Sequence, residues 1–358
     1  MPSLKEIKVR INSISSTLAI TSAMKMVAAA KLQKAQMAIQ NMLPYERRLH
    51  SMLIDLMGAM NISAAASEDG SVRGSGSAER GFDQSGDRLS LSNRHDLAGM
   101  DGAYSLMAQR EVRKVAIVAF ASNSSLCGAF NSNVIREATA VINEYRASGL
   151  GDADITVYSV GRKMAEAMKK LGFPSPADFT KMSDSPSYDA ASALAQELFD
   201  GFVSGRFDKV ELVYNHYKST SSQPTTRQTY LPLSLADATA DIQVGKITDS
   251  ASESDTNRGA EPVGAPVVRQ GSPTTEDLIV EPSKEALIAT LLPKVIRLRI
   301  FTTLLDSAAA EHAARTVAMQ LATDNGNDLL QELTLEYNKG RQQKITSEIL
   351  DLVGGSMQ

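Results

Sequence analysis

Apolar residues recur with a seven-residue period along the first forty residues of the chain. They form two tracks at alternating steps of three and four, which is typical of a coiled-coil seam. The tracks are Leu4, Ile11, Leu18, Leu32 and Ile39, and Ile7, Ile14, Ala28, Ala35 and Met42. Ser3 and Glu6 have the spacing of a capping box at the start of a helix. The pattern predicts a helix over residues 1–60, bent at Pro44 and on the order of 85 Å long.

A second helical pattern covers residues 281–358. Its apolar positions are Leu287, Leu291, Val295, Leu298, Leu305, Leu330, Leu333, Tyr337, Ile345, Ile349 and Leu352. A helix of this length would reach on the order of 105 Å. Two such helices bury their apolar stripes most simply against each other as an antiparallel coiled coil. Alanines at 28–30, 308–310 and 313–314 would let the two helices approach closely.

The middle of the chain alternates between strand-like and helix-like segments. VRKVAIVAF, ITVYSVG and VELVYNHYKS are rich in β-branched residues and predict strands, and TRQTYLPL predicts an edge strand. Helical patterns lie between the first three strands. Residues 111–235 are therefore expected to form a small open α/β domain. The polar tracts at 61–110 and 236–280 have no period and are expected to be flexible.

Composition and the absence of known motifs argue against several classes of partner and cofactor. The 37 basic and 41 acidic residues nearly balance, so neither nucleic acid nor a membrane surface is an expected partner. No apolar run is long enough to span a membrane, and the amino terminus resembles neither a signal nor a transit peptide. No phosphate-loop, dinucleotide-binding or zinc motif occurs, so we expect no cofactor and no metal.

The single cysteine, Cys127, suggests one candidate for nucleophilic chemistry. His216 could in principle serve as the base that a thiolate nucleophile needs. The residue types favour the other interpretation, in which Cys127 is a small buried side chain at a strand end. We therefore expect no catalytic site.

Four segments, in order along the chain, carry a family resemblance. SAMKMVAAAKLQKAQ (22–36) and the long segment at 309–355 resemble the terminal signatures of the ATP synthase gamma subunit family. SLCGAFNSNV (125–134) and YNHYKS (214–219) resemble its central motifs. The resemblance implies an α/β fold with a long two-helix coiled coil and a Rossmann-like central domain.

The resemblance also implies a function. The family's gamma subunit is a non-catalytic rotor that couples proton flow to conformational cycling of the catalytic beta subunits. Its implied partners are the ring of alpha and beta subunits, the epsilon subunit and the ring of c subunits. The implied location is the cytoplasmic face of a bacterial plasma (inner) membrane, without a membrane span of its own.

The matching positions imply contact residues. Met24, Lys25 and Met26 would face acidic loops of beta, and Arg315 would take part in coupling. The polar contacts expected near the carboxy terminus are made by Arg341, Gln342, Thr346 and Glu348, of which Glu348 is expected to pair within the chain. The last residues, among them Leu352, Val353 and Met357, would turn in an apolar sleeve as a bearing.

Each assignment has a plainer alternative. Lys25 could be a solvated lysine, Arg315 could form a surface ion pair with Glu311, and the terminus could be frayed. Asn123, Ser124 and Ser125 stand where the family usually has Asp-Arg-Gly, and Ala310 stands where it usually has serine. The alternative function is a non-rotary coiled-coil scaffold whose α/β domain binds a small ligand.

Overall fold

The computed structural model describes residues 3–68, 110–233 and 284–356. Most of the two polar tracts, at 69–109 and 234–283, therefore lies outside the described residues, as does Met357. Helix α1 spans Leu4–Glu68 and helix α8 spans Lys284–Ser356. The first helix continues past residue 60, so the boundary predicted there lies inside α1 and is wrong.

Helix α1 begins as its sequence predicts. The backbone N–H of Ser3 donates to Glu6 Oε2 over 3.0 Å, and the N–H of Glu6 donates to Ser3 Oγ over 3.3 Å. These two bonds satisfy donors that have no partner inside the first helical turn. Pro44 lies inside α1 and Pro293 inside α8, and neither proline ends its helix.

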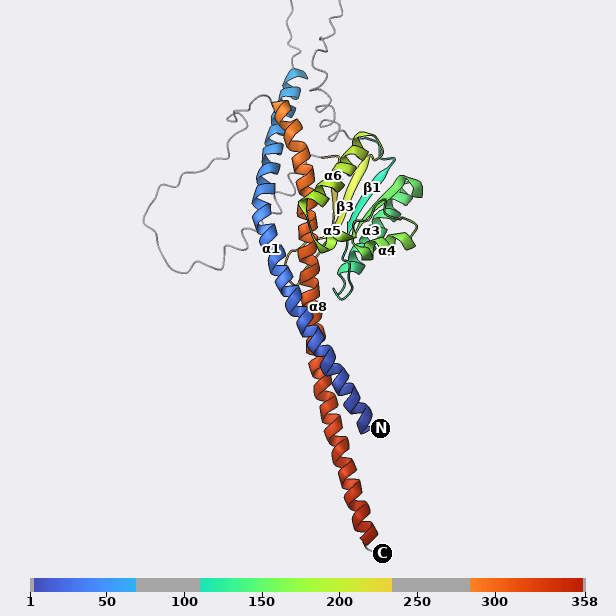
Figure 1. Cartoon of the computed structure of the whole chain (residues 1–358). Helices are drawn as coiled ribbons and strands as arrows, with labels where there is room; N and C mark the ends of the chain where they lie inside the picture. Colours follow the sequence, from blue (N-terminus) through green and yellow to red (C-terminus); the bar gives the residue numbers. More distant parts are fainter. Residues whose placement is uncertain (1–2, 69–109, 234–283, 357–358) are drawn as a thin grey trace, which may run out of the picture.

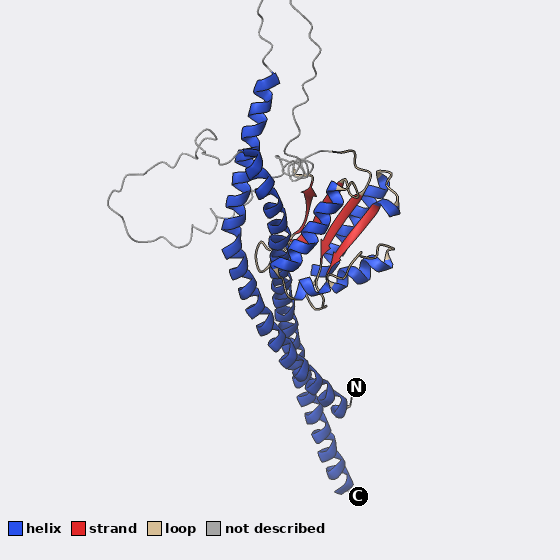
Figure 2. Cartoon of the chain, turned by 45° about the horizontal axis from the view of Figure 1, so that its top comes forward, coloured by secondary structure: helices blue, strands red, loops and turns tan. Residues whose placement is uncertain are grey.

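The two long helices lie side by side and run in opposite directions (Figure 1 and Figure 2). Leu4 lies against Gly340 and Leu18 against Gly326, and the Oγ1 atoms of Thr21 and Thr323 are 3.2 Å apart. Each step toward the carboxy terminus of α1 thus goes with an equal step toward the amino terminus of α8. This fixed register keeps one face of each helix against the other over many turns.

A mixed four-stranded sheet forms the centre of the chain. Its strands are β1 (Val115–Phe120), β2 (Ile155–Val160), β3 (Lys209–Asn215) and β4 (Thr225–Leu231), in the order β2-β1-β3-β4. The first three are parallel and β4 is antiparallel to β3. The connecting helices are α3 (Phe130–Ala147), η1 (Asp152–Asp154), α4 (Arg162–Lys170), α5 (Thr180–Asp184) and α6 (Tyr188–Val203). The α/β composition expected from the sequence is confirmed, and the segment TRQTYLPL forms β4 at one edge of the sheet.

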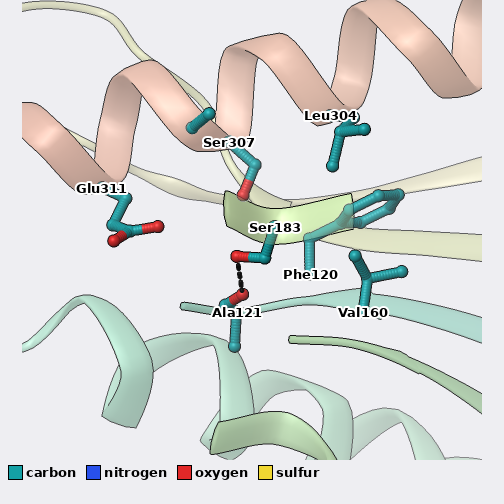
Figure 3. A pocket seen from close by; sticks show the side chains of 8 residues that line it. Phe120, Ala121, Val160, Ser183, Leu304, Ser307 and Glu311 are labelled. Atoms are coloured by element: carbon teal, nitrogen blue, oxygen red, sulfur yellow. Dashed lines mark hydrogen bonds between the residues drawn. The ribbon is translucent and has the colours of Figure 1, made fainter. Parts of the chain in front are cut away.

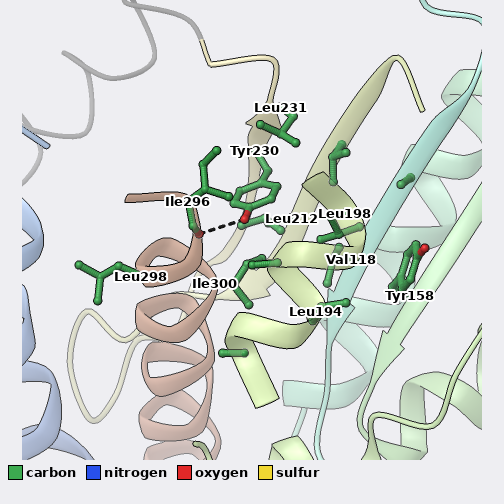
Figure 4. Close-up of a cluster of buried hydrophobic side chains, with 14 of the residues drawn as sticks. Val118, Tyr158, Leu194, Leu198, Leu212, Tyr230, Leu231, Ile296, Leu298 and Ile300 are labelled. Atoms are coloured by element: carbon green, nitrogen blue, oxygen red, sulfur yellow. Dashed lines mark hydrogen bonds between the residues drawn. The ribbon is translucent and has the colours of Figure 1, made fainter. Parts of the chain in front are cut away.

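Alternate residues of β1 belong to two different cores, because successive side chains of a strand point to opposite faces. Val115, Ile117 and Ala119 pack with residues of α3 and α4. Ala116, Val118 and Phe120 pack in a second core with residues of α6 and α8. Figure 4 shows Ile296 and Ile300 of α8 on the side of the helix that faces the sheet and Leu298 on its opposite side, and all three residues belong to this second core. Helix α8 is therefore a structural layer of the domain as well as half of the helix pair.

Gly161, between β2 and α4, generates a prediction about stability. Its φ is +98°, and a Cβ added there would lie 2.0 Å from the carbonyl oxygen of Ala121. Gly149 has a similar φ of +94° but open space around the added Cβ. Gly149→Ala should therefore lower the free energy of unfolding by about 1–2 kcal/mol through backbone strain alone. Gly161→Ala should lower it by clearly more, because backbone must also move.

Urea unfolding of the purified chain, followed by circular dichroism, measures the difference. Equal losses in the two variants would show that the close approach of β2 and β1 at Gly161 is not as described.

Candidate interaction surface along the long helices

Met24, Lys25 and Met26 lie in succession in the amino-terminal half of α1. Met24 is 39% exposed and Met26 is 63% exposed. The half-buried Lys25 donates from Nζ to Oε1 of Gln320 on α8 over 2.6 Å. Gln320 in turn donates to both carboxylate oxygens of Asp324. Lys25 therefore donates across the helix pair, and its ammonium group still has further donors for a carboxylate from outside.

Other apolar side chains are exposed on the same stretch of the helix pair. They are Val9, Ile20 and Val27 on α1 and Val317, Leu321 and Leu329 on α8. Single exposed apolar residues are common on soluble proteins, but a series of them along a paired rod is typical of a surface that another protein covers. This stretch is a candidate contact surface.

Arg315 has a different environment from the one expected. Its guanidinium donates to Glu311 Oε1 over 2.7 Å, and only 14% and 10% of the two side chains are exposed. It also donates to Ser124 Oγ over 2.7 Å, in the loop that follows β1. Burial raises the pKa of Glu311 and the charge of Arg315 opposes this rise. The pair with Glu311 exists within α8 but is largely buried, so the expectation of a surface ion pair is wrong, and it is the bond from Arg315 to Ser124 that joins α8 to the domain.

The carboxy-terminal part of α8 extends beyond α1 (Figure 1). Arg341, Gln342, Thr346 and Glu348 are all exposed there. Thr346 Oγ1 donates to the carbonyl of Gln342 over 2.9 Å, and Glu348 lies 3.7 Å from Lys344 Nζ. Apolar side chains accompany them: Ile345, Ile349, Leu350, Leu352 and Val353 are 48–74% exposed. This single helix presents both polar and apolar side chains on several sides.

A small hollow lies at the carboxyl ends of β1 and β2, where open α/β sheets usually bind ligands. The space in it that is open to a water-sized molecule is only about 10 Å³, whereas small-molecule sites usually occupy about 300–1,000 Å³. Figure 3 shows that α8 covers it with Leu304, Ser307 and Glu311. Helix α8 thus takes the place that a ligand would need.

Cys127 and His216 do not form a nucleophile and base. Cys127 is 1% exposed and its sulfur accepts from Asn131 Nδ2 over 3.2 Å. His216 Nδ1 instead lies 2.6 Å from Oδ2 of Asp306 on α8. The interpretation of Cys127 as a small buried side chain is confirmed.

Comparison with known proteins decides the family. The family model described as ATP synthase matches residues 3–357. The ATP synthase gamma chain of Phocaeicola vulgatus is 47% identical over 357 residues, and that of Bacteroides thetaiotaomicron is 45% identical over 358, each match covering 100% of both chains.

The chain belongs to the ATP synthase gamma chain family.

The fold agrees with this assignment. The rotor of the Euglena gracilis mitochondrial ATP synthase superposes with a TM-score of 0.51 at 18% identity, over 96% of this chain and 98% of that one. Gamma chains are non-catalytic subunits, and the catalytic sites are on beta. Within the described residues, no helix is long and apolar enough to cross a membrane.

Sequence reasoning missed the residues that join the α/β domain to the long helices. Asp306 accepts from His216 and from the backbone N–H of Tyr217, and Tyr230 donates to the carbonyl of Ile296 over 2.9 Å. The motif YNHYKS contains two of these residues, but nothing in its spacing indicates their partners on α8. The contacts between the domain and the long helices can therefore be identified only from the fold.

His312, on α8, generates a prediction about how stability depends on pH. Its Nδ1 is buried without a hydrogen-bond partner among the described residues. Burial, and then the charges of Arg315 and Lys31, lower the pKa of His312 to about 4. The unfolded chain therefore binds a proton between about pH 6.5 and 4 that the folded chain does not, so folded stability falls as the pH falls through this range.

His312→Gln removes this titration. The wild type should lose about 1 kcal/mol more than the variant between pH 7 and pH 4.5, a figure reduced because the imidazole is partly exposed. His216→Gln is the matched control, because the effect of pH on stability has the opposite sign at His216. The bond to Asp306 raises the pKa of His216, so the stability that this pair contributes is present below pH 6.5 and is lost as the pH rises above it. Urea unfolding at several pH values measures both. Parallel pH profiles for wild type and His312→Gln would contradict the account.

Proposed function

We propose that the chain is the rotating central stalk of a bacterial ATP synthase, which couples proton flow to conformational cycling of the catalytic beta subunits. The observation that supports this most strongly is the shape of the chain. A long helix pair carries the α/β domain on one side, and one helix then continues alone with exposed polar and apolar residues. Such a slender, uneven rod suits the centre of a larger ring.

The asymmetry of this rod supplies the coupling. Each beta subunit would meet a different side of the shaft as it turns, and a contact that favours one state over another shifts the equilibrium between open and closed forms. The shift is limited to the difference in contact free energy between the two states. The shaft therefore needs direction-dependent contacts more than strong ones.

The helix pair is a left-handed antiparallel coiled coil in this proposal. The seven-residue period and the constant register of Leu4, Leu18 and Thr21 against α8 support this geometry. The proposed divisions are a coiled-coil segment formed by α1 up to Glu68, the α/β domain at 111–235 and a coiled-coil segment at 281–358, while most of the segments predicted to be flexible, at 61–110 and 236–280, lie outside the described residues.

Three groups of residues would contact the ring. Met24 and Met26 offer exposed apolar surface beside Lys25, whose free donors can bind a carboxylate of beta. Arg341, Gln342, Thr346 and Glu348 offer polar groups, with the planar guanidinium of Arg341 suited to bidentate binding of a carboxylate. Leu352, Val353 and Met357 would form the apolar bearing.

The partners follow from this arrangement. The helix pair would be enclosed by the alpha and beta subunits, and the α/β domain would bind the epsilon subunit and the ring of c subunits. The relatives in Phocaeicola and Bacteroides support a bacterial inner-membrane complex, with this chain on the cytoplasmic side. A ligand-binding scaffold is disfavoured because α8 fills the place where the domain would hold a ligand.

Copurification and complementation test the proposed function. A tagged chain expressed in place of the gamma chain of a bacterium lacking it should copurify with alpha and beta and restore ATP-driven proton pumping. Alpha and beta should still bind nucleotide when the chain is absent, because the chain is needed for coupling and not for nucleotide binding by beta. A chain that stays free of alpha and beta, or copurifies without restoring pumping, contradicts the proposal.

Arg341 gives a sharper test within the assembled complex. Arg341→Ala should lower the rate of ATP synthesis about fivefold, the factor that corresponds to about 1 kcal/mol of lost charge-assisted contact. Lys339→Ala is the matched control, because it removes the same charge from an exposed position two residues away. Synthesis rates in membrane vesicles, normalised to the amount of complex, measure both. Equal effects of the two substitutions would mean that general charge, rather than a specific contact of Arg341, is responsible.

A further inference from the structure

The loop between β3 and β4, residues 216–224, connects the domain to both long helices. It is called the junction loop below. His216 Nδ1 lies 2.6 Å from Asp306 Oδ2, and the N–H of Tyr217 donates to Asp306 Oδ1 over 2.9 Å. Both oxygens of one α8 carboxylate are thus used by two successive loop residues. The hydroxyl of Tyr217 accepts from Gln36 Nε2 of α1 over 2.6 Å.

The ring of Tyr217 also packs between the helices and the domain. It contacts one apolar cluster made by Leu32 of α1 with Ala309 and Ala313 of α8. It contacts a second cluster made by Cys127 and Phe130 of the domain with Ala310 of α8. Tyr217 therefore belongs to the packing of α1, α8 and the domain at once.

The junction loop is itself well anchored. Asn215, the last residue of β3, is buried and donates to the carbonyl of Phe130 over 3.0 Å, while Thr225 donates to Asn215 Oδ1 over 2.7 Å. His216 N–H donates to the carbonyl of Pro224 over 2.9 Å, which closes the loop. A force on Tyr217 is thus carried directly into the sheet.

Rotation loads this junction in a particular direction. A domain beside a turning shaft is pushed tangentially, so the contact surfaces tend to slide past each other rather than to separate. Apolar packing is non-directional and resists sliding poorly, whereas hydrogen bonds to a charged group are directional and stronger than neutral ones. The polar links Arg297–Gln196 and Arg315–Ser124 join the domain to α8.

We propose that the junction loop, through His216 and Tyr217, transmits torque between the α/β domain and the two-helix shaft. The inference rests on the proposed rotary function and assigns a positioning role to Tyr217, Asp306 and Gln36. Because Tyr217 engages α1 and α8 together, the helices cannot roll against each other without moving the domain. The loop thus makes three parts of the chain turn as one body.

The torsional stiffness of the assembled complex tests this role. The chain, with Lys169→Cys as an exposed labelling site on α4 and Cys127 buried, is assembled with alpha and beta on a surface. A bead on the label reports angular fluctuations while a non-hydrolysable ATP analogue holds the shaft. Asp306→Ala and Tyr217→Ala should each increase the angular variance, and together they should increase it about twofold, since directional bonds to both helices are lost.

Lys218→Ala, an exposed substitution in the same loop, is the matched control and should leave the variance unchanged. Tyr217→Phe keeps the ring and loses only the hydroxyl, so it should give an intermediate variance and remains informative if Tyr217→Ala does not fold. Wild-type variance in both Asp306→Ala and Tyr217→Phe would overturn the inference. A wild-type complex whose bead does not turn with ATP would overturn the proposed function itself, and the inference with it.

Discussion

The small side chains of α8 at Ala309, Ala310 and Ala313 allow two different neighbours to lie close to one helix. Ala309 and Ala313 pack with Leu32 of α1, whereas Ala310 packs with Cys127 and Phe130 of the domain. All three alanines are fully buried. Because side-chain size sets the distance between packed elements, larger residues here would separate α8 from α1 or from the domain. The packing of α8 against both α1 and the domain therefore depends on these three alanines.

Features set by local pattern were predictable. The seven-residue period predicted α1 and its pairing with α8, the β-branched run predicted β1, and Ser3 with Glu6 predicted the helix start. Apolar periodicity states which residues are buried but not which neighbour buries them. For that reason the alanines were interpreted as a helix–helix contact, although Ala310 faces the domain. The end of α1 was missed because the residues up to Glu68 have no sustained apolar period.

The features of the candidate site can likewise be separated into those that local sequence pattern predicts and those that depend on packing between distant residues. Met24 and Met26 are exposed and available for contact, but the bond from Lys25 to Gln320 joins residues far apart in sequence. Arg315 paired with Glu311 as its i, i+4 spacing predicted, while its burial and its bond to Ser124 follow from the packing of the domain on α8. Ser124 is one of the residues that depart from the family pattern, so this chain makes the link with a hydroxyl. Local spacing cannot reveal such long-range partners.

A disulfide between the two long helices tests most directly whether they move as a single shaft in fixed register. Thr21→Cys and Thr323→Cys replace hydroxyls that lie 3.2 Å apart, a separation that suits a disulfide after small adjustment. We expect the bond to form on oxidation and the oxidised complex to keep its rotation and ATP synthesis, as helices that turn together are not hindered by a covalent link. Failure of the bond to form, or loss of rotation that reduction restores, would contradict the account.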